Sequence, residues 1–543
     1  MTTHGGPGTT GRPLRPTNAP PTLRAVGLAL AVAFAFPGVY LVYRNFAEGA
    51  DPAGLLLSDR TIGPLWRSLR LAVSVSAAAL VLGTALAWLT TRTDLPLNRL
   101  WRIVLPLPLV FPTFVGAAAF IHTLNPGGLA NDLLGAIGVD RTPELRGLFG
   151  AWLVLTLMTY PYVYLPVAAR LRQLPSTLEE SARVLGDTAL KVFGRVCVPQ
   201  MATAMGAGTL LVFLYTLSDF GAVQLMRYDT LTRAIATNQL ANPPVALALS
   251  LMLLVLAALV VLGERRVSHR LPDASGGQSN RPMVYGLGRW RAPALGFVVL
   301  AAGGAVGAPL VALLDWAAGG LARSATGGRP LTIDASNVLD ATVNTLGVSA
   351  VAAVVSTAAV LPIALLVGRY RSRAGSFAHA VVISTFALPG ILIALSMRFW
   401  TLRSDLAFEL FNDTMAVLIF AYVVRFGSLA MGVTLVAVRS VPDRLHDSAR
   451  ILGAGRVRRF FSVDVPIMAP GLLAGTGLVL LSVMKELPIS LFVSPLGFST
   501  LATRIFGSFE DAFIAEAGIM AVVLVALSFV LTWFLVIRRD HLM

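Results

Sequence analysis

The stretch Glu180-Ser181-Ala182-Arg183-Val184-Leu185-Gly186, separated by nine residues from Val196-Cys197-Val198-Pro199, decides the fold because the chain repeats it. The second copy runs Asp447-Ser448-Ala449-x-x-x-Gly453, then nine residues, then Val463-Asp464-Val465-Pro466. Both copies are polar segments between long apolar runs. We therefore expect the chain to dock a partner at two equivalent places.

The apolar runs around the two copies are long enough to be membrane spans. Of the 543 residues, 56% are hydrophobic and 13% are charged, and the mean hydropathy of +0.74 is outside the usual range of soluble domains. A helix needs roughly 20 apolar residues to cross a bilayer. The sequence predicts an all-α polytopic membrane protein with twelve spans, at 24–44, 66–90, 102–124, 147–169, 201–223, 244–263, 293–315, 341–368, 376–399, 414–438, 467–492 and 515–537.

The net charge of +15 indicates orientation and does not indicate a nucleic-acid partner. If the N-terminus starts inside the cell, most of the Lys and Arg residues fall on cytoplasmic segments, which is the positive-inside bias. Both copies of the motif and both termini are then cytoplasmic. The segment between the two halves alone carries six arginines: Arg265, Arg266, Arg270, Arg281, Arg289 and Arg291.

The repeat extends well beyond the motif. Pro175 and Pro442 precede the two copies at the same distance, and acidic Asp219 and Glu486 follow them at the same distance. Upstream, Pro112 matches Pro389 after a change of register of about ten residues, which places a longer external loop around 124–146 in the first half. Because both halves put the motif on the same side, we expect a parallel duplication with a pseudo-two-fold axis along the membrane normal.

Each copy of the motif predicts a short helix, a break and a second helix. Acidic residues follow Pro175 and Pro442, Gly186 and Gly453 can end a helix, and Pro199 stands at the start of the next span. The apolar pairs Val184-Leu185 and Ile451-Leu452 would fill a groove in a partner, as amphipathic helices do.

These motifs resemble the EAA loop of type I ABC importer permeases, and the resemblance covers roughly residues 66–537. In that family the loop forms a coupling helix that sits in a cleft of the ATP-hydrolysing subunit. Ser181 and Ser448 replace the first alanine of the family pattern, and Asp447 replaces its glutamate, so the two docking sites can be unequal. The resemblance implies a coupling role for Glu180, Ser181, Ala182, Gly186, Pro199, Asp447, Ser448, Ala449, Gly453 and Pro466.

The resemblance also defines the expected partners. The chain has no G-x4-G-K-[ST] phosphate loop, so we expect no enzymatic activity and no cofactor bound by this chain. ATP would be used by two copies of a separate ABC ATPase on the cytosolic face, which would rock the two halves between inward and outward access. An extracytoplasmic substrate-binding protein would dock on the outer face, and the location would be a bacterial cytoplasmic membrane.

The expected divisions of the chain follow from the repeat and the resemblance. They are a disordered cytoplasmic tail at 1–22, a first helix and external loop at 23–63, a first permease domain at 64–263, a flexible cytosolic linker that acts as a tether at 264–292, a helix and external loop at 293–339, a second permease domain at 340–537 and a cytoplasmic C-terminus at 538–543.

Four charged residues lie within or near the ends of the spans: Asp219, Arg425, Lys485 and Glu486. A charge at mid-bilayer costs on the order of 2.5–3.5 kcal/mol on insertion scales, so such residues usually face a protein interior or a water-filled path. One interpretation places them around the translocation path. The alternative is that Glu486 pairs with Lys485 or Arg425 and that Asp219 caps a broken helix end. Neither the single histidines His122 and His446 nor the sole cysteine, Cys197, predicts a metal or catalytic site.

The cargo is indicated only by resemblance. Ser218-Asp219-Phe220-Gly221, Tyr228-Asp229-Thr230, Lys485-Glu486-Leu487-Pro488 and Thr500-Leu501-Ala502-Thr503-Arg504 are similar to the ferric-iron branch of these permeases. Thiamine and phosphonate permeases are also similar and stay open as alternatives. A secondary transporter would have inverted repeats and ion ligands at mid-membrane. A membrane-embedded enzyme would need clustered His, Asp or Glu, which the sequence does not show.

Overall fold

The structure is a computed structural model that describes residues 19–47, 54, 56, 58–126, 128, 144–268, 283–325 and 334–534. All of its named elements are helices. The predicted tail up to residue 18, most of the long external loop, linker residues 269–282 and the C-terminus from residue 535 lie outside the described residues.

The first half holds α3 to α14. Their bounds are α3 (Asp59–Arg92), α4 (Asn98–Val104), η1 (Leu107–Val110), α5 (Thr113–Leu124), α7 (Gly147–Thr159), α8 (Pro161–Gln173), α9 (Ser176–Val184), α10 (Ala189–Val192), η2 (Phe193–Cys197), α11 (Val198–Ser218), α12 (Gly221–Leu225), α13 (Leu231–Ala241) and α14 (Pro243–Ser268).

The second half repeats this order. Its elements are α17 (Ala335–Gly368), α18 (Arg373–Ser384), η5 (Thr385–Ala387), α19 (Gly390–Arg403), α20 (Asp405–Phe411), α21 (Met415–Arg439), α22 (Asp443–Ile451), α23 (Arg456–Arg459), η6 (Phe460–Asp464), α24 (Val465–Met484), α25 (Pro488–Val493), α26 (Leu501–Glu510) and α27 (Ile514–Thr532). Outside the two repeats lie α1 (Pro21–Ala47), η3 (Gly288–Trp290), α15 (Arg291–Ala302), η4 (Gly303–Gly307) and α16 (Ala308–Ala325).

Two of the predicted spans are not straight. Within the described residues ten helices are long and apolar enough to cross a membrane, or up to twelve if each of two bent pairs is one span. The predicted spans 102–124 and 376–399 are these pairs, bent by 102° and 103°. Proline causes both bends: Pro112 and Pro389 fix their own φ and exclude the helical conformation from the residue before them.

Two further spans end earlier than predicted. The helix expected at 201–223 stops at Ser218, and the helix expected at 467–492 stops at Met484. Each is followed by a charged residue and a short helix, α12 or α25. The acidic residues Asp219 and Glu486 therefore stand at helix breaks, where main-chain amides are open to capping.

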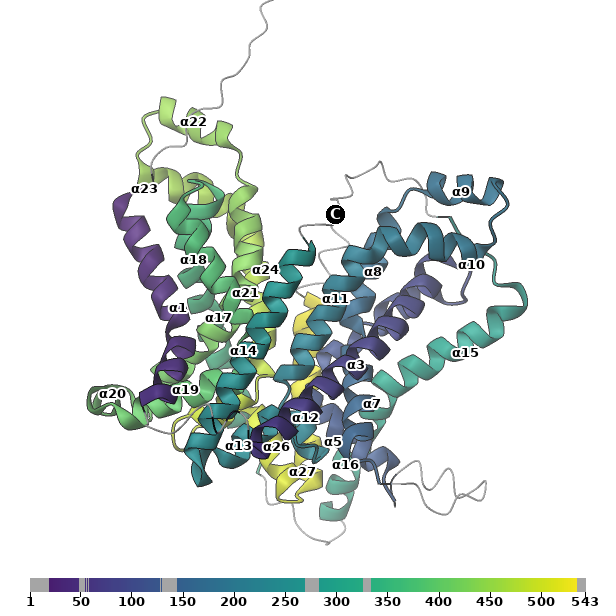
Figure 1. The fold of residues 1–543 in the computed structure, drawn as a ribbon, viewed down its shortest axis with the longest axis horizontal. Coiled ribbons are helices and arrows are strands. Elements are labelled where there is room, and N and C mark those ends of the chain that lie inside the picture. The colour runs from purple at the N-terminus through teal and green to yellow at the C-terminus, as the bar shows by residue number, and fades with distance from the viewer. Residues whose placement is uncertain are drawn as a thin grey trace, which may run out of the picture.

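The duplication of halves is confirmed at the level of the helices. Helices α3 and α17 both have 34 residues, and each half has one bent pair, one short polar helix and one π-helical turn in corresponding places. The short helices α9 and α22 lie on the same side of the molecule, at the top of Figure 1. We call this side the α9/α22 face.

The halves exchange their outer helices. Helix α1, which begins the chain, packs on α17, α18 and α19 of the second half, with Phe36 against Trp400 at 5.3 Å between ring centroids and Ser396 donating to the Pro37 carbonyl at 2.8 Å. Helix α15 packs on α4 and α16 packs on α5 of the first half, and α16 packs more extensively still on α27 at the end of the second half. Figure 1 shows α1 beside α18 and α15 beside α3, on opposite flanks of the molecule. Neither half is therefore closed by its own chain segment.

Candidate functional site

Helix α9 ends at a glycine in the left-handed region. Gly186 has φ +91°, its amide donates to the Arg183 carbonyl at 3.0 Å, and the Asp187 amide donates to the Ala182 carbonyl at 3.1 Å. These are the bonds of a Schellman C-cap, which favours glycine because it has no Cβ. The Ser181 hydroxyl donates to the Thr177 carbonyl, and Glu180 is exposed.

Helix α22 repeats this geometry. Gly453 has φ +75°, its amide donates to the Arg450 carbonyl at 2.9 Å, and the Ala454 amide donates to the Ala449 carbonyl at 2.9 Å. The Ser448 hydroxyl donates to the Arg444 carbonyl, and Asp447 is exposed. The glycines of the motif are thus explained by backbone geometry, and the acids that open it face solvent.

Both short helices present apolar side chains to solvent. Val184 and Leu185 are 87% and 86% exposed, and Ile451 and Leu452 are 86% and 84% exposed. Burial of one such side chain is worth roughly 1.5–3 kcal/mol, so exposing four in matched pairs is unfavourable in the isolated chain. Such matched apolar pairs on the α9/α22 face are typical of an interaction surface.

The proline of each motif follows a π-helical turn. Pro199 and Pro466 occupy the first turn of α11 and α24, directly after η2 and η6. Proline has no amide hydrogen, and its ring crowds the carbonyl four residues earlier. The helix there takes the π-helical hydrogen-bond spacing of five residues in place of four. Each short helix is thus joined to its span by the same local irregularity.

A buried ion pair connects α9 to the first half. The Arg92 guanidinium, at the end of α3, lies 2.8 Å from a Glu179 carboxylate oxygen, and both side chains are 0% exposed. Arg92 Nη2 also donates to the carbonyls of Leu171 and Leu174, and the Tyr285 hydroxyl donates to Glu179 at 2.9 Å. Burial raises the pKa of the Glu179 carboxyl, and the charge of Arg92 opposes this shift.

Linker residues take part in this anchor. The backbone of Tyr285 pairs with residues 92–94: its amide donates to the Arg92 carbonyl at 2.8 Å, and its carbonyl accepts from the Asp94 amide at 3.2 Å. The Leu287 amide donates to the Asp94 carboxylate at 2.8 Å. The interpretation of 264–292 as a plain tether is therefore wrong for this part of it, because the segment is hydrogen-bonded into the first half.

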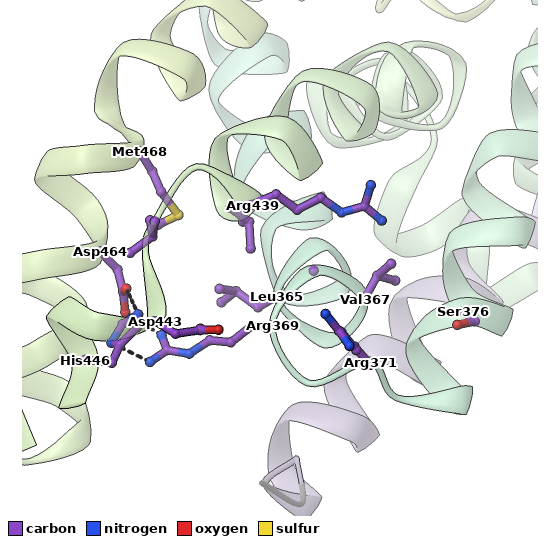
Figure 2. A pocket seen from close by; sticks show the side chains of 13 residues that line it. Leu365, Val367, Arg369, Arg371, Ser376, Arg439, Asp443, His446, Asp464 and Met468 are labelled. Carbon is purple, nitrogen blue, oxygen red and sulfur yellow. Dashed lines mark hydrogen bonds and ion pairs between the residues drawn. The ribbon is translucent and has the colours of Figure 1, made fainter. Parts of the chain in front are cut away.

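A different set of side chains anchors α22. Arg369, at the end of α17, lies 2.7 Å from Asp464 of η6 and 2.6 Å from the His446 ring nitrogen Nδ1. The other ring nitrogen, Nε2, lies 2.9 Å from Asp464. Figure 2 shows these three side chains together on one wall of a cavity. Burial, and then Arg369, lower the pKa of His446, while Asp464 opposes this.

The two anchors occupy corresponding positions. Arg92 matches Arg369, Glu179 matches His446, and Cys197, which is buried, matches Asp464. In the first half the acid is on the short helix, and in the second half it is on the π-helical turn that follows. The motif pointed to Glu180 and Asp447, but the buried residues each precede them by one position. The signal that could have found them is an arginine at the same place in both halves, at the end of a long apolar run.

The Asp219 carboxylate caps α12. It accepts hydrogen bonds from the amides of Ala222 and Val223 at 3.0 and 3.4 Å and from the Thr113 hydroxyl at 2.5 Å. Thr113 begins α5, directly after the bend at Pro112. The geometry of Asp219 therefore matches the capping alternative, and the contact ties the bend to the helix break.

Glu486 stands at the corresponding break but is less well satisfied. Its position faces Gly390, which begins α19 and matches Thr113 of the first half: a Cβ added to Gly390 would lie 2.2 Å from Glu486 Oε1. Among the described residues Oε1 has no hydrogen-bond partner although it is buried. The expected ion pairs of Glu486 with Lys485 or Arg425 do not form within hydrogen-bonding distance in this part of the chain.

Lys485 and Arg425 donate to main-chain carbonyls at the two bends. Lys485 Nζ lies 2.7 Å from the Leu109 carbonyl of η1, and Arg425 Nη1 lies 2.5 Å from the Leu388 carbonyl beside η5. A cation there satisfies carbonyls that the bend leaves without an intrahelical partner. Lys485 belongs to the second half and Leu109 to the first, so this contact crosses between the halves. Among the described residues no group of three or more His, Cys, Asp and Glu side chains could hold a metal ion.

Comparison with known proteins gives the same picture of two matched halves. Residues 75–271 and 360–539 match the family described as "Binding-protein-dependent transport system inner membrane component". The chain is 27% identical over 519 residues to the Fe(3+)-transport system permease protein FbpB 2 of Haemophilus influenzae, covering 94% of this chain and 97% of that protein.

Two other relatives match only part of the chain. The molybdenum transport system permease protein ModB of Mycobacterium tuberculosis is 28% identical over 254 residues, which cover 46% of this chain and 94% of ModB. The putative 2-aminoethylphosphonate transport system permease protein PhnU of Salmonella typhimurium is 29% identical over 205 residues, covering 36% of this chain and 72% of PhnU.

The two family matches together span more than half of the chain, in the same two places as the repeated helices. The chain is therefore a multi-pass inner-membrane protein, and its own role is not catalytic, because a partner ATPase hydrolyses the ATP. It belongs to the family of binding-protein-dependent transport inner-membrane components, as the permease subunit of an ABC importer with both halves in one chain.

Proposed function

We propose that this permease imports Fe(III), and that α9 and α22 are the coupling helices on which two copies of the ATPase dock. The observation that carries the docking proposal is the matched pair of short helices on the α9/α22 face, each with two apolar side chains at least 84% exposed. Each helix is closed by a glycine C-cap and fastened to the end of a long span. Force applied to either helix would therefore reach α3 or α17 directly.

The proposed orientation puts the α9/α22 face in the cytoplasm, together with both termini. The positive-inside bias supports it, since Arg289 and Arg291 of the described part of the linker and the three arginines of α23 lie on this side of the spans. The substrate-binding protein would then dock on the opposite face, where α13, α20 and α26 lie in Figure 1.

The iron proposal is supported by the relative that matches almost the whole chain and whose name states Fe(3+) transport. The PhnU relative supports a phosphonate as the second candidate, but over about a third of the chain. The parallel arrangement of the halves disfavours a secondary transporter with inverted repeats.

We propose that Glu486 lines the translocation path and is the charged side chain that contacts cargo or water there. Asp219, Arg425 and Lys485 bond to backbone or hydroxyl groups at the helix breaks, as stabilising residues would. Glu486 Oε1 is the carboxylate oxygen without a partner among the described residues at this junction. A path that must release its cargo needs few such ligands.

The docking proposal is tested by placing a charge on each helix. Val184→Asp and Ile451→Asp should each weaken capture of the purified ATPase by roughly tenfold or more. Each change removes the burial of one apolar side chain, worth about 1.5–3 kcal/mol, and about 1.4 kcal/mol corresponds to a tenfold change in affinity. ATP-driven uptake should fall with it. Leu406→Asp on α20, 68% exposed on the opposite face, is the matched control and should change neither. Full capture by both helix variants would refute the assignment.

Bulky substitutions of Gly186 and Gly453 test the same helices through the backbone. Nothing lies within 4 Å of a Cβ at either position, so the effect would come from the positive φ alone. Both uptake and ATPase capture should fall.

The cargo is tested by uptake in cells that lack the chain. Radiolabelled Fe(III) uptake should be restored by the wild-type chain and should not be restored when the ATPase partner carries an inactive phosphate loop. Restoration of 2-aminoethylphosphonate uptake without iron uptake would overturn the iron proposal and leave the docking proposal standing. The ligand of a binding protein encoded next to this chain is an independent check.

A further inference from the structure

The cavity beside α22 is the least explained feature of the α9/α22 face. It has a volume of about 580 Å³ and lies between the ends of α17 and α21, the start of α18, and α22 and η6. We call it the arginine cavity, because Arg369, Arg371 and Arg439 line it, together with Asp443, His446 and Asp464. Figure 2 shows Arg371 and Arg439 on the side opposite His446. Its volume is within the usual range of small-molecule pockets.

Two of the three arginines are not used by the protein in the part of the chain that the structure describes. The Arg369 side chain is paired with Asp464 and His446, whereas the guanidinium groups of Arg371 and Arg439 have no ion pair or hydrogen bond to any described residue. Asp443 also lines the cavity. The two positive charges of the unpaired guanidinium groups therefore outnumber the one negative charge of the unpaired carboxylate. A concave wall with this excess of positive charge attracts anions.

The first half shows what fills the corresponding place there. Tyr285 contacts Trp88 at 5.4 Å between ring centroids, pairs with Arg92 and Asp94 through its backbone, and donates to Glu179. These residues match Leu365, Arg369, Arg371 and His446, all of which line the arginine cavity. The chain thus closes the first site with its own linker, while none of the described residues closes the second site in this way.

The charge at one of these positions is reversed between the halves. Asp94 accepts from the Leu287 amide in the first half, and its counterpart Arg371 can only donate. Arg371 also has φ +47°, in a region that side-chain-bearing residues seldom occupy. The second site therefore cannot hold a segment in the way the first does, and it suits an acceptor with several oxygens.

We propose that the arginine cavity binds a phosphate-bearing anion, which bridges Arg371 and Arg439 and so ties the segment between α17 and α18 to the end of α21, beside α22. Guanidinium groups bind phosphate through paired N–H donors, which a single chloride ion cannot match. The anion is either a soluble phosphate or the headgroup of an anionic lipid, because both offer the same oxygens. Binding does not depend on the proposed function; an effect on ATPase coupling does.

The test uses a cysteine reporter in the full-length chain. Ser376 lines the cavity and is exposed, and the native Cys197 is buried, so Ser376→Cys in a Cys197→Ala background gives one accessible thiol. In detergent, inorganic phosphate at several times its dissociation constant should slow maleimide labelling roughly fivefold, because only the unbound fraction reacts. Sodium chloride at the same ionic strength should have no such effect.

Two variants locate the binding site, and two lipid compositions identify the source of the phosphate group. Arg371→Gln with Arg439→Gln should abolish protection, while Arg172→Gln, the counterpart of Arg439 in the first half, should leave it intact. Protection in nanodiscs of phosphatidylglycerol but not of phosphatidylcholine would identify a lipid headgroup as the source, and protection by phosphate in detergent would identify a soluble anion.

Three outcomes would overturn the proposal. They are equal protection by chloride, unchanged protection in the double variant, and no protection by either phosphate or anionic lipid. Faster labelling after deletion of residues 1–18, with no response to phosphate, would assign the cavity to the N-terminal segment instead and would also overturn it. Because labelling measures binding alone, none of these results bears on whether α22 docks an ATPase.

Discussion

The two short helices have the same outer surface and different undersides. Above, α9 and α22 share a glycine C-cap, a serine bonded to the preceding turn and an exposed apolar pair. Below, α9 is held by an ion pair to its own Glu179, while α22 is held by a histidine between Arg369 and Asp464. The exposed sides of the two helices are alike, and the sides packed on the ends of the spans differ.

The difference shows that the arginine at the end of the long span is the fixed part of the anchor. The acid that pairs with this arginine is Glu179 on the short helix α9 in the first half, and Asp464 on the π-helical turn η6 in the second half. Both acids reach the arginine at the end of the long span. Only in the first half does the ion pair hold the short helix directly. In the second half the link passes through a ring that can gain a proton.

The largest effect should come from removing the two arginines. Arg92→Met leaves a fully buried carboxylate with only the Tyr285 hydroxyl, so the free energy of unfolding should fall by about 3–5 kcal/mol. Arg369→Met should cost about 1–2 kcal/mol, because Arg369 is 25% exposed and Asp464 keeps its contact with His446. Denaturant titration in mixed micelles measures both, and equal losses would contradict the comparison.

A second experiment converts one anchor into the other. Glu179→His places a ring beside Arg92 without an acid, and protection of the α9 amides from hydrogen exchange should fall roughly tenfold, about 1.4 kcal/mol. Adding Cys197→Asp supplies the acid from η2, as in the second half, and should restore most of that protection. If the double variant is no better than the single one, the positions are not equivalent.

A smaller effect is expected from the linker. Tyr285→Phe removes one hydrogen bond to Glu179, which should lower protection of α9 by about 1 kcal/mol and leave α22 unchanged. Exchange measured over both helices in one sample provides the internal control. A change in α22 of similar size would mean that the effect is global.

The smallest effect should be a difference in pH response. Since the pKa of His446 is lowered in the packed state, the unpacked state binds the proton more tightly, and α22 should lose protection as the pH falls below about 6.5. The pKa of Glu179 is raised, so α9 should lose protection as the pH rises above the ordinary glutamate value.

Exchange rates corrected for intrinsic pH dependence, taken between about pH 5 and 7, should thus move in opposite directions for the two helices. His446→Gln should remove the response of α22 and leave that of α9. A parallel response of both helices would exclude this account of the anchors.

The repeated helices could be predicted because their cause is local. The length of each apolar run predicts a span, and the glycines of the motif predict the C-caps of α9 and α22. The matching positions of these glycines and of the prolines predict the duplication. The 102° and 103° bends were missed because the apolar runs continue through them, although Pro112 and Pro389 already matched between the halves.

The anchors could not be predicted, because they depend on distant pairs. Arg92 and Glu179 are far apart in the sequence, and only packing of α3 against α8, which leads into α9, brings them to 2.8 Å. The same holds for Asp219 and Thr113 and for Lys485 and the Leu109 carbonyl. The cap at Asp219 was one of the two alternatives for that residue. For Arg425 and Lys485 the alternatives were a path or a pair with Glu486, whereas both donate to main-chain carbonyls at bends that were not foreseen.

Because the outer helices are exchanged between the halves, α1 must wait during synthesis for the helices on which it packs. Helix α1 is made first, but α17, α18 and α19, on which it packs, follow roughly 300 residues later, which at about 5–20 residues per second is a delay on the order of tens of seconds. Among the described helices of the first half α1 packs mainly on α14, which itself begins at Pro243, about 200 residues after α1. A chain cut short between the halves would therefore leave α1 without the helices α17, α18 and α19 on which it packs.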